Sequence, residues 1–327
     1  MKAAVRDRYG SVDVVRLDEI EQPVLIEDQV LVRVEAASVN RADLDALGPK
    51  PAFARLFMGV RAPRARQLGA DVAGVVEATG PAATRFRPGD RVFGDMFSFG
   101  AGSFAEYVCA PERAFQTIPA DLSFDVAATL PHSAVLALQG LRLRNGRTPQ
   151  PGARVLVDGA SGNVGPFAVQ IAQAMGAEVT GVASGPKLDL ARSIGADHVI
   201  DYTRTDYTRN GQRYDWIVDV DSHHSVFAVR RALREDGVYV TLGGTATSIL
   251  GALLLGPLLG PLTGRHMGLM WWWKPFHAPD VATLTGLIAE GKVKPVIDRR
   301  FPLEQVADAL RYVDDGHARG KVIVTPV

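Results

Sequence analysis

The chain has 327 residues, of which 47% are hydrophobic and 22% are charged, so it is long enough for two ordinary globular domains. Its 36 Lys and Arg residues balance 36 Asp and Glu residues, which gives no electrostatic reason to expect a nucleic acid or a membrane as partner. The single cysteine, Cys109, excludes an intramolecular disulfide, and the N-terminus lacks the apolar core of a signal peptide, so we expect a cytoplasmic protein.

The first 120 residues predict a mostly β domain. Gln29–Val34 alternates apolar and polar residues, as a half-buried strand does. Val72–Ala78 is a run rich in β-branched residues, and Phe104–Ala110 is a further candidate strand. The sequence Pro88-Gly89-Asp90 marks a turn between such strands.

From Asp121 onward the pattern changes to helices and strands in alternation. Ser123–Leu143 has helical spacing behind a Ser or Asp cap. Beyond it we predict strands at Arg154–Asp158, Glu178–Ala183, His198–Asp201, Trp216–Val220 and Val238–Leu242, and helices at Val164–Met175 and Lys187–Ile194. This alternation is typical of βαβ units and a parallel sheet. Residues 296–327 return to a strand, a helix (Leu303–Asp314) and a last strand (Lys321–Thr325).

A glycine-rich turn lies between the first strand and the first helix of this alternation. The expected cofactor-binding residues are Gly159, Ala160, Ser161, Gly162, Asn163 and Val164, followed by Gly165. Small residues let the backbone approach a pyrophosphate, and the helix that follows directs its N–H groups and its positive dipole end toward the phosphates. Because a strand precedes the turn and a helix follows it, we predict a dinucleotide-binding site.

The end of the second strand indicates which dinucleotide is bound. An NAD-binding unit carries an Asp or Glu about twenty residues after the turn. Here Ser184 and Lys187 occupy that region, and no acidic residue appears before Asp189. A hydroxyl and an ammonium suit a 2′-phosphate, so the predicted cofactor is NADPH.

The order and spacing of several short motifs cover nearly the whole chain. They are Val39–Asp43, Leu68–Val76, Arg87–Val92, Gly102–Tyr107, Gly159–Gly165, Ile194–Asp197 and Gly316–Val324. Together they resemble the medium-chain dehydrogenase/reductase superfamily. The resemblance implies an α/β protein: a GroES-like, mostly β domain formed by residues 1–120 and 296–327, with a Rossmann domain inserted at residues 121–295. It also implies that Tyr202 joins Ser184 and Lys187 at the 2′-phosphate, and that Leu242, Gly243 and Gly244 line the nicotinamide.

The zinc branch of that family uses ligands that this chain lacks. Asn40 stands where that branch has a cysteine, and Gly69-Ala70-Asp71 stands where it has Gly-His-Glu. A catalytic zinc needs such ligands, so we expect no metal. The chain is therefore similar to the zinc-free quinone and enone reductases. The pair His223-His224 is interpreted as part of a loop and not as a metal site.

The same resemblance names candidate catalytic residues. Asn40 matches an asparagine near the nicotinamide ribose, and Asp43 matches a residue that also has a structural interpretation. His132 lies in a segment that approaches the nicotinamide in relatives, and it is a candidate proton donor because histidine titrates near neutrality. Two departures leave the substrate and the proton donor open: Asp45 replaces a frequent tyrosine, and Leu136 replaces a frequent threonine.

The predicted function is hydride transfer from NADPH to an activated C=C bond or a quinone of a hydrophobic small molecule, by a homodimer. The alternatives are a ketone or aldehyde reductase and a non-catalytic NADPH-binding protein of a structural or membrane-associated kind. The apolar run Ile249–Leu262 bears on this choice. It is too short to span a membrane, and we expect it to form a wall of the substrate pocket, with a subunit contact or a membrane surface as alternatives.

Overall fold

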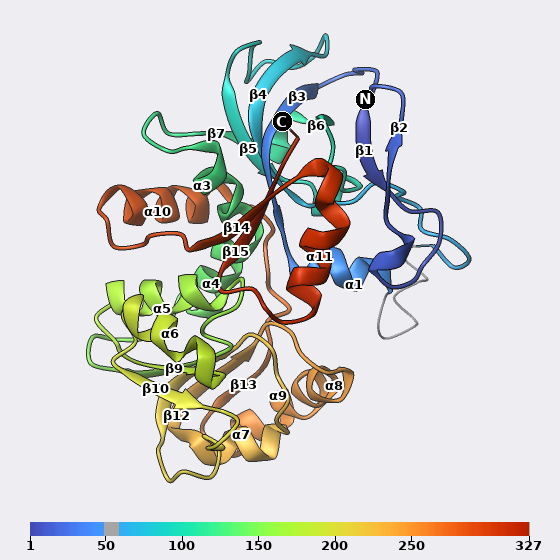
Figure 1. The fold of residues 1–327 in the computed structure, drawn as a ribbon. Coiled ribbons are helices and arrows are strands. Elements are labelled where there is room, and N and C mark those ends of the chain that lie inside the picture. The colour runs from blue at the N-terminus through green and yellow to red at the C-terminus, as the bar shows by residue number, and fades with distance from the viewer. Residues whose placement is uncertain (49–58, 327) are drawn as a thin grey trace. The chain divides into compact units, whose positions relative to one another are not determined.

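The computed structural model describes residues 1–48 and 59–326, which form two compact units. Unit 1 consists of Met1–Ser133, Pro275–Val281 and Ile297–Val327, and unit 2 consists of Ala134–Lys274 and Ala282–Val296. The chain thus leaves unit 1, forms unit 2 and returns, as expected for an inserted Rossmann domain (Figure 1). The boundary after Ser133 lies later than the expected one at residue 121, because the first helix after Ser123 packs on strands of unit 1.

Unit 1 is built around one long strand, β3 (Gln29–Val39). The order of its main sheet is β14 (Ile297–Pro302), β15 (Lys321–Thr325), β3, β4 (Asp71–Thr79), β5 (Arg91–Asp95) and β7 (Phe115–Thr117). The strand β6 (Tyr107–Pro111) pairs with the first half of β3, while β15 pairs with its end. A separate hairpin joins β1 (Lys2–Val5) and β2 (Arg16–Glu19).

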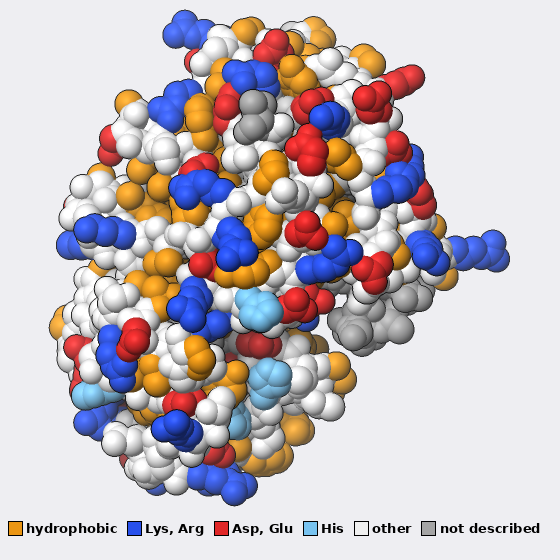
Figure 2. All heavy atoms as spheres, viewed as in Figure 1, with side chains coloured by type: hydrophobic (Ala, Val, Ile, Leu, Met, Phe, Trp, Pro, Cys, Tyr) orange, Lys and Arg blue, Asp and Glu red, His pale blue; other side chains and the backbone are white. Residues whose placement is uncertain are grey.

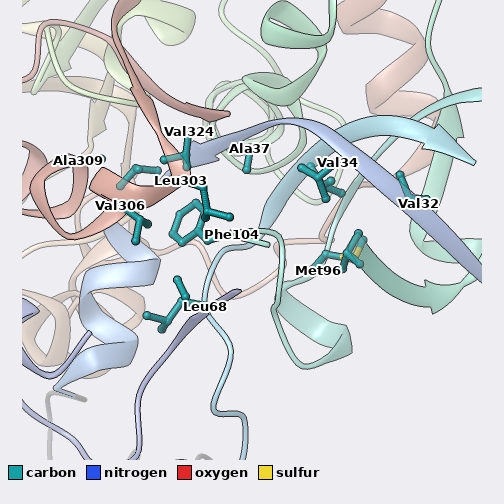
Figure 3. Packing of buried hydrophobic residues seen from close by; sticks show 14 of the residues in the cluster. Val32, Val34, Ala37, Leu68, Met96, Phe104, Leu303, Val306, Ala309 and Val324 are labelled. Atoms are coloured by element: carbon teal, nitrogen blue, oxygen red, sulfur yellow. The ribbon is translucent and has the colours of Figure 1, made fainter. Parts of the chain in front are cut away.

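The core of unit 1 lies between this sheet and two helices, α1 (Arg41–Leu47) and α11 (Val306–Asp314). Figure 3 shows Ala37 of β3 close to Val324 and Leu303, with Phe104 beside them. Because β15 and α11 come from the last residues of the chain, the C-terminal segment completes a core that the N-terminal segment begins.

Unit 2 contains a six-stranded parallel sheet. Its order is β10 (His198–Asp201), β9 (Glu178–Ala183), β8 (Arg154–Asp158), β11 (Tyr214–Asp219), β12 (Leu233–Thr241) and β13 (His266–Leu269). The first five strands confirm the predicted ones within a few residues, whereas β13 was not predicted. The middle of β8 is wholly buried, as expected for a parallel strand covered on both faces.

Helices connect the strands of unit 2. They are α4 (Val135–Gly140), α5 (Gly165–Ala174), α6 (Leu188–Ser193), α7 (Val226–Ala232), α8 (Ala246–Leu254) and α9 (Gly256–Leu262). A further helix, α10 (Ala278–Ala289), begins in unit 1 and ends in unit 2.

Two predicted elements differ from the structure. The helix expected over Ser123–Leu143 is divided into α3 (Phe124–Ala128), a wider helical turn at Leu130–Ala134, and α4, because Pro131 has no N–H to continue a regular helix. The strand expected from Phe104 begins only at Tyr107, because the backbone of Phe104 instead bonds to Ala4 and Leu68.

The apolar run at 249–262 lies largely in α8 and α9, which connect β12 to β13. Ligands of parallel sheets bind at the carboxyl ends of the strands. The helix α8 begins near that edge, but α9 ends just before the amino end of β13. The expectation that the whole run forms a wall of the substrate pocket is therefore wrong for α9. Within the described residues, no helix is long and apolar enough to cross a membrane.

Candidate functional site

The predicted strand, glycine turn and helix are all present in unit 2, as β8, residues 159–164 and α5. Gly159 has a φ of +82°, a conformation that favours glycine. A Cβ on Gly165 would lie 2.1 Å from the carbonyl oxygen of Gly159, so only glycine lets the helix pack on the turn. A Cβ on Gly162 would meet only that same oxygen, at 3.7 Å. The space beside Gly162 is therefore open to a ligand.

One of the six predicted residues of the turn supports the turn and does not face a ligand. Ala160 is wholly buried, and its N–H donates to Val182 in β9 at 2.9 Å, so it anchors the turn to the sheet and does not face a ligand. The helix α5 starts with Pro166 in its first turn and has no side-chain cap, which leaves backbone N–H groups at its N-terminus for an anion. These features fit a dinucleotide pyrophosphate.

The predicted 2′-phosphate residues lie together at the carboxyl ends of β9 and β10. Ser184 follows β9, and Tyr202 follows its neighbour β10 and donates its N–H to the carbonyl of Ala183 at 3.2 Å. Lys187 ends a helical turn in which its N–H donates to Ser184 at 2.8 Å. The Tyr202 side chain is exposed. The structure therefore brings all three residues to one edge of the sheet.

Two further charged residues at this edge were missed. Asp201, the last residue of β10, accepts bonds from the hydroxyl and the N–H of Thr203, at 2.7 and 3.0 Å, and these bonds lower the pKa of its carboxyl. Arg204 lies 3.6 Å from the same carboxylate, and its guanidinium is largely exposed. Arg204 partly offsets the negative charge of Asp201 and is a further candidate for a 2′-phosphate contact. The spacing Asp-x-x-Arg after the strand was the available sequence signal.

A pair of carboxylates lies beside the glycine turn. Asp158 ends β8, Asp219 ends β11, and the two residues are register partners. Burial, and then the neighbouring acidic groups, raise the pKa of Asp158. Burial also raises the pKa of Asp219, although the hydroxyl of Tyr239 donates to it at 3.1 Å. The raised pKa of Asp158 favours its neutral carboxyl, which would reduce the repulsion of a bound phosphate.

The residues expected at the nicotinamide continue from β12. The N–H of Leu242 donates to the carbonyl of Asp219 at 2.8 Å. Gly244 has a φ of +132°, and a Cβ there would lie 2.3 Å from the carbonyl oxygen of Ser222. Gly243 accepts the N–H of Ser222 at 3.1 Å. The double glycine thus allows the backbone to pass close to the loop after β11, at the carboxyl edge of the sheet.

Unit 1 contains a buried polar cluster centred on Lys321, the first residue of β15. The Lys321 side chain is 1% exposed. Its ammonium donates to Asn40 Oδ1 at 2.6 Å and to Ser133 Oγ at 3.1 Å, and it lies 3.4 Å from Asp71 Oδ2. Burial lowers the pKa of Lys321 and raises the pKa of Asp71, while their mutual attraction opposes both shifts. This cluster brings together residues that are far apart in the sequence.

Asn40 and Asp43 lie at the start of α1. The N–H of Asn40 donates to Asp43 Oδ2 at 2.8 Å, so Asp43 holds the first turn of the helix. Burial raises the pKa of Asp43 to about 7. The Asn40 amide also donates to Asp71 Oδ2 at 2.9 Å. These bonds support the structural interpretation of Asp43 and connect Asn40 to the buried cluster.

His132 joins the same cluster from the wider helical turn. The backbone N–H of His132 donates to Asp71 Oδ1 at 3.0 Å, and the imidazole Nδ1 lies 3.6 Å from Asp95 Oδ2. Burial opposes the charge on the imidazole, but the carboxylates of Asp95 and Asp71 outweigh it and raise the pKa of His132. The ring of Phe97 lies 5.8 Å from the imidazole, and the His132 side chain keeps 9% of its surface exposed. A histidine held between carboxylates and narrowly open to its surroundings can hold and release a proton.

Within the described residues, no group of three His, Cys, Asp or Glu side chains is arranged to hold a metal ion. His223 lies 3.4 Å from Asp221, whereas His224 stacks edge-on against Tyr207 at 4.9 Å. The two histidines thus have different partners.

Comparisons with known proteins agree with this architecture. Residues 26–120 match the family model described as alcohol dehydrogenase GroES-like domain, and residues 194–324 match the one described as zinc-binding dehydrogenase. The chain is 33% identical to the mitochondrial NAD(P)H oxidoreductase RTN4IP1 of Mus musculus, over 100% of this chain and 89% of that protein. It is 32% identical to the chloroplastic NADPH-dependent alkenal/one oxidoreductase of Arabidopsis thaliana, over 100% of this chain and 80% of that protein.

Among solved structures, the quinone oxidoreductase from Coxiella burnetii superposes with a TM-score of 0.87 at 27% identity. The match covers 100% of this chain and 99% of the other. The similarity therefore extends over both units and not only over the glycine turn.

Proposed function

The chain belongs to the medium-chain dehydrogenase/reductase superfamily, and from that family membership we propose a specific reaction. It is an oxidoreductase of the quinone and enone reductase type, with a nicotinamide cofactor. We propose that it transfers hydride from NADPH, without zinc, to an activated C=C bond or a quinone of a hydrophobic small molecule. The observation that carries this proposal is the buried ammonium of Lys321.

The residues of the buried polar cluster do not fit a catalytic zinc. Asp71 stands where the zinc branch has a ligand, but its Oδ2 already faces Lys321 Nζ at 3.4 Å. Asn40, at another ligand position, accepts from the same ammonium. A zinc ion bound there would lie next to a buried positive charge, and Asn40 and Ala70 replace the thiolate and imidazole ligands of the zinc branch. The ammonium instead supplies the positive charge that offsets Asp71.

The choice of NADPH rests on the edge formed by Ser184, Lys187 and Tyr202, together with Arg204. A hydroxyl, an ammonium and a guanidinium suit a phosphate dianion, and Arg is well matched to its geometry. Asp201 accepts bonds from its own neighbours and so is not directed at a ribose hydroxyl. The name of the Arabidopsis relative, which specifies NADPH, agrees with this choice.

The nicotinamide would supply the hydride, and the chain would supply position, shielding and a proton. Hydride addition to the β-carbon of an enone moves the C=C electron pair toward the carbonyl oxygen, and a proton then completes the saturated product. Reduction of a quinone likewise needs one hydride and one proton. We propose that His132 gives this proton and that Asp95 holds its ring, because Asp95 Oδ2 lies 3.6 Å from Nδ1.

The substrate class is tested by NADPH oxidation with matched compounds. We expect turnover of a quinone and of an α,β-unsaturated ketone, and none of the corresponding saturated ketone. NADH should replace NADPH poorly. Turnover of the saturated ketone alone would favour a ketone or aldehyde reductase. A protein that binds NADPH but turns over no compound of the panel would favour the non-catalytic alternative.

The proton donor is tested by the variants His132→Gln and Asp95→Asn. A group that gives a proton must be protonated, so the wild-type kcat should fall as pH rises through the pKa of His132, which lies above its ordinary value. We expect His132→Gln to lower kcat about 100-fold or more and to remove this alkaline limb, with unchanged NADPH affinity. An unaltered pH profile in that variant would assign the proton to water or to another group.

The assembly and location stay predictions. We propose a homodimer, which light scattering tests, and no nucleic-acid partner. The cytoplasmic location expected from the sequence also stays a prediction, since two relatives are named mitochondrial and chloroplastic.

A further inference from the structure

Two carboxyl groups lie side by side at the carboxyl edge of the unit 2 sheet. Asp158 and Asp219 are register partners at the ends of adjacent parallel strands, and Asp219 is fully buried while Asp158 is partly buried. On the molecular face in Figure 2, acidic and basic side chains lie among one another, whereas the strongest charges acting on Asp158 are those of Asp219 and Asp221. Two buried anions this close would repel each other, so the pair needs a proton or a cation.

The hydrogen bonds around the pair leave one donor and one acceptor unused. Asp219 Oδ2 accepts from the hydroxyl of Tyr239 at 3.1 Å, and that hydroxyl lies 3.2 Å from Ser222 Oγ. Among the described residues, neither Asp219 Oδ1 nor the hydroxyl of Tyr207 has a hydrogen-bond partner, and both atoms are buried. Tyr207 is 1% exposed, and its hydroxyl lies close to the carboxyl of Asp158. Buried polar groups are nearly always hydrogen-bonded, so these two atoms require an explanation.

A single proton on Asp158 satisfies both atoms. Register partners in neighbouring strands lie about 4.8 Å apart, which brings the two carboxyls within reach of a shared proton. A protonated carboxyl has one O–H donor and keeps acceptor capacity, so Asp158 would donate to Asp219 Oδ1 and accept from Tyr207. A trapped water would also join these groups, but it would leave both charges uncompensated. A metal ion fits less well, because the described residues contain no third metal-ligating side chain arranged with the pair.

The pair also joins the three segments of the proposed NADPH site. Asp158 directly precedes the glycine turn. Tyr207 lies in the segment after β10, which begins with Tyr202 of the 2′-phosphate edge. The carbonyl of Asp219 accepts the N–H of Leu242, in the segment expected at the nicotinamide. The charge of the pair therefore acts where these three segments meet.

We propose that Asp158 and Asp219 share one proton, and that this proton makes NADPH binding depend on pH. The inference rests on the proposed NADPH site. With the proton in place, hydrogen bonds hold the three segments together. When the proton is lost, the two carboxylates repel each other and also repel the phosphates of the dinucleotide. Proton retention and NADPH binding therefore favour each other.

The direction of the pH effect follows from the groups that face the pair. Burial, and then the charges of Asp219 and Asp221, raise the pKa of Asp158 well above its ordinary value. Burial raises the pKa of Asp219 only to about 6, so near pH 7 the proton belongs on Asp158. The other groups that face the pair are Asp206, Tyr207, Ser222, His223, His224 and Tyr239, and the helix α7 adds valine and alanine side chains to the core beneath them. None of these groups gains positive charge as pH rises, so the proton is present below the raised pKa of Asp158 and is lost above it.

Infrared spectroscopy in D2O tests the shared proton directly. At pH 7.5 the wild type should show the carbonyl stretch of a protonated carboxylic acid that Asp158→Asn lacks. Asp43, with a pKa of about 7, contributes equally to both proteins and cancels in the difference spectrum. The asparagine amide keeps a donor for Asp219 and an acceptor for Tyr207, so the variant should unfold cooperatively. If it does not, Asp219→Asn takes its place, because removing either acid removes the shared proton.

Fluorescence titration of NADPH tests the consequence for binding. Between pH 7 and pH 9.5 the wild-type Kd should rise at least about tenfold, as expected when binding needs a proton that is lost over this range. Asp158→Asn should keep nearly the same affinity throughout. The matched control is Asp221→Asn, which removes an exposed carboxylate near the pair but not the shared proton. It should keep the alkaline loss, shifted to lower pH because one repulsive charge is gone. Titration of lysines near pH 9.5 affects all three proteins alike.

The outcomes separate this inference from the proposed function. A difference spectrum without a protonated carboxyl would show that Asp158 is ionised and would overturn the shared proton. An affinity that is constant with pH in the wild type, or that falls equally in Asp158→Asn, would overturn the link to NADPH binding. A protein that shows the carboxyl signal but binds no NADPH at any pH would refute the proposed NADPH site and support the shared proton alone.

Discussion

Replacing Lys321 with methionine removes the buried ammonium and leaves the rest of the side chain nearly unchanged in size. The ammonium lies 3.4 Å from Asp71 Oδ2, and at an effective dielectric constant of 20 the attraction at that distance is about 5 kcal/mol. The variant also loses the bonds to Asn40 and Ser133. Removing one partner of a buried ion pair typically costs about 3–5 kcal/mol, so we expect Lys321→Met to lose stability in that range.

The carboxyl of Asp71 makes this loss depend on pH. Its pKa is already raised by burial, and it should rise further when the ammonium is removed. Below that pKa the variant folds with a neutral Asp71, and above it the variant must bury an unpaired charge. The stability of Lys321→Met should therefore fall as pH increases from 5 to 8. Urea unfolding at several pH values measures the loss, and the thermal midpoint should fall by roughly 6–20 °C at pH 8.

A double-mutant cycle separates the charge from the packing. Asp71→Asn in the Lys321→Met background removes the unpaired charge and keeps an acceptor for the N–H of His132. We expect the double variant to recover most of the lost stability and to lose the added pH dependence of Lys321→Met. A Lys321→Met protein within 1 kcal/mol of wild type at pH 8, or a double variant as unstable as the single one, would refute the ion pair as the centre of this cluster.

Four further predictions concern the cofactor, a buried carboxyl and the metal. Gly162→Val should abolish NADPH binding in a fluorescence titration, because the valine side chain would fill the space left for the pyrophosphate. The thermal midpoint should not change, because a Cβ on Gly162 meets only the Gly159 oxygen, at 3.7 Å. Normal NADPH binding by this variant would make the turn purely structural. Lys187→Ala should weaken NADPH binding by about 1.5–3 kcal/mol and leave NADH binding unchanged, and an equal loss of both would exclude a 2′-phosphate contact. Asp43 has a pKa of about 7 when folded against an ordinary 3.8, so its stabilising contribution is complete below the ordinary value and is lost as pH rises through 7. Asp43→Asn should therefore be more stable than wild type at pH 8 but not at pH 4. The gain in stability at pH 8 is about 1.4 kcal/mol for each tenfold difference in proton affinity between the folded and the unfolded carboxyl. Equal urea unfolding curves for the two proteins at pH 8 would contradict this. A chelator should leave kcat unchanged, and stoichiometric zinc in active, tag-free protein would refute the zinc-free proposal.

Local features of the sequence determined the Rossmann core. Apolar runs such as Glu178–Ala183 and His198–Asp201 are bounded by glycine or polar residues, and they form strands with the predicted ends. The glycine turn was predicted for the same reason: Gly159 and Gly165 are needed by a backbone geometry that a few neighbouring residues set, whereas Gly162 leaves space for the ligand. Such features depend on contacts close in sequence, so the residue pattern alone reveals them.

Pairings between distant segments were decided only by the tertiary structure. The ammonium of Lys321 meets Asp71 and Asn40 because β15 returns beside the end of β3, and no sequence spacing encodes that contact. Asp158 and Asp219 become neighbours only because β11 lies next to β8 in the sheet.

The apolar run at 249–262 shows the same division. Composition alone identified it as a segment that needs a partner, but it did not show which side would be covered. The close approach of Gly256 to the carbonyl of Met267 turns the glycine side inward and leaves Leu258 in solvent. Hydrophobic pattern is a property of the chain itself, whereas exposure depends on which surfaces the rest of the fold leaves uncovered, and only the folded molecule determines that.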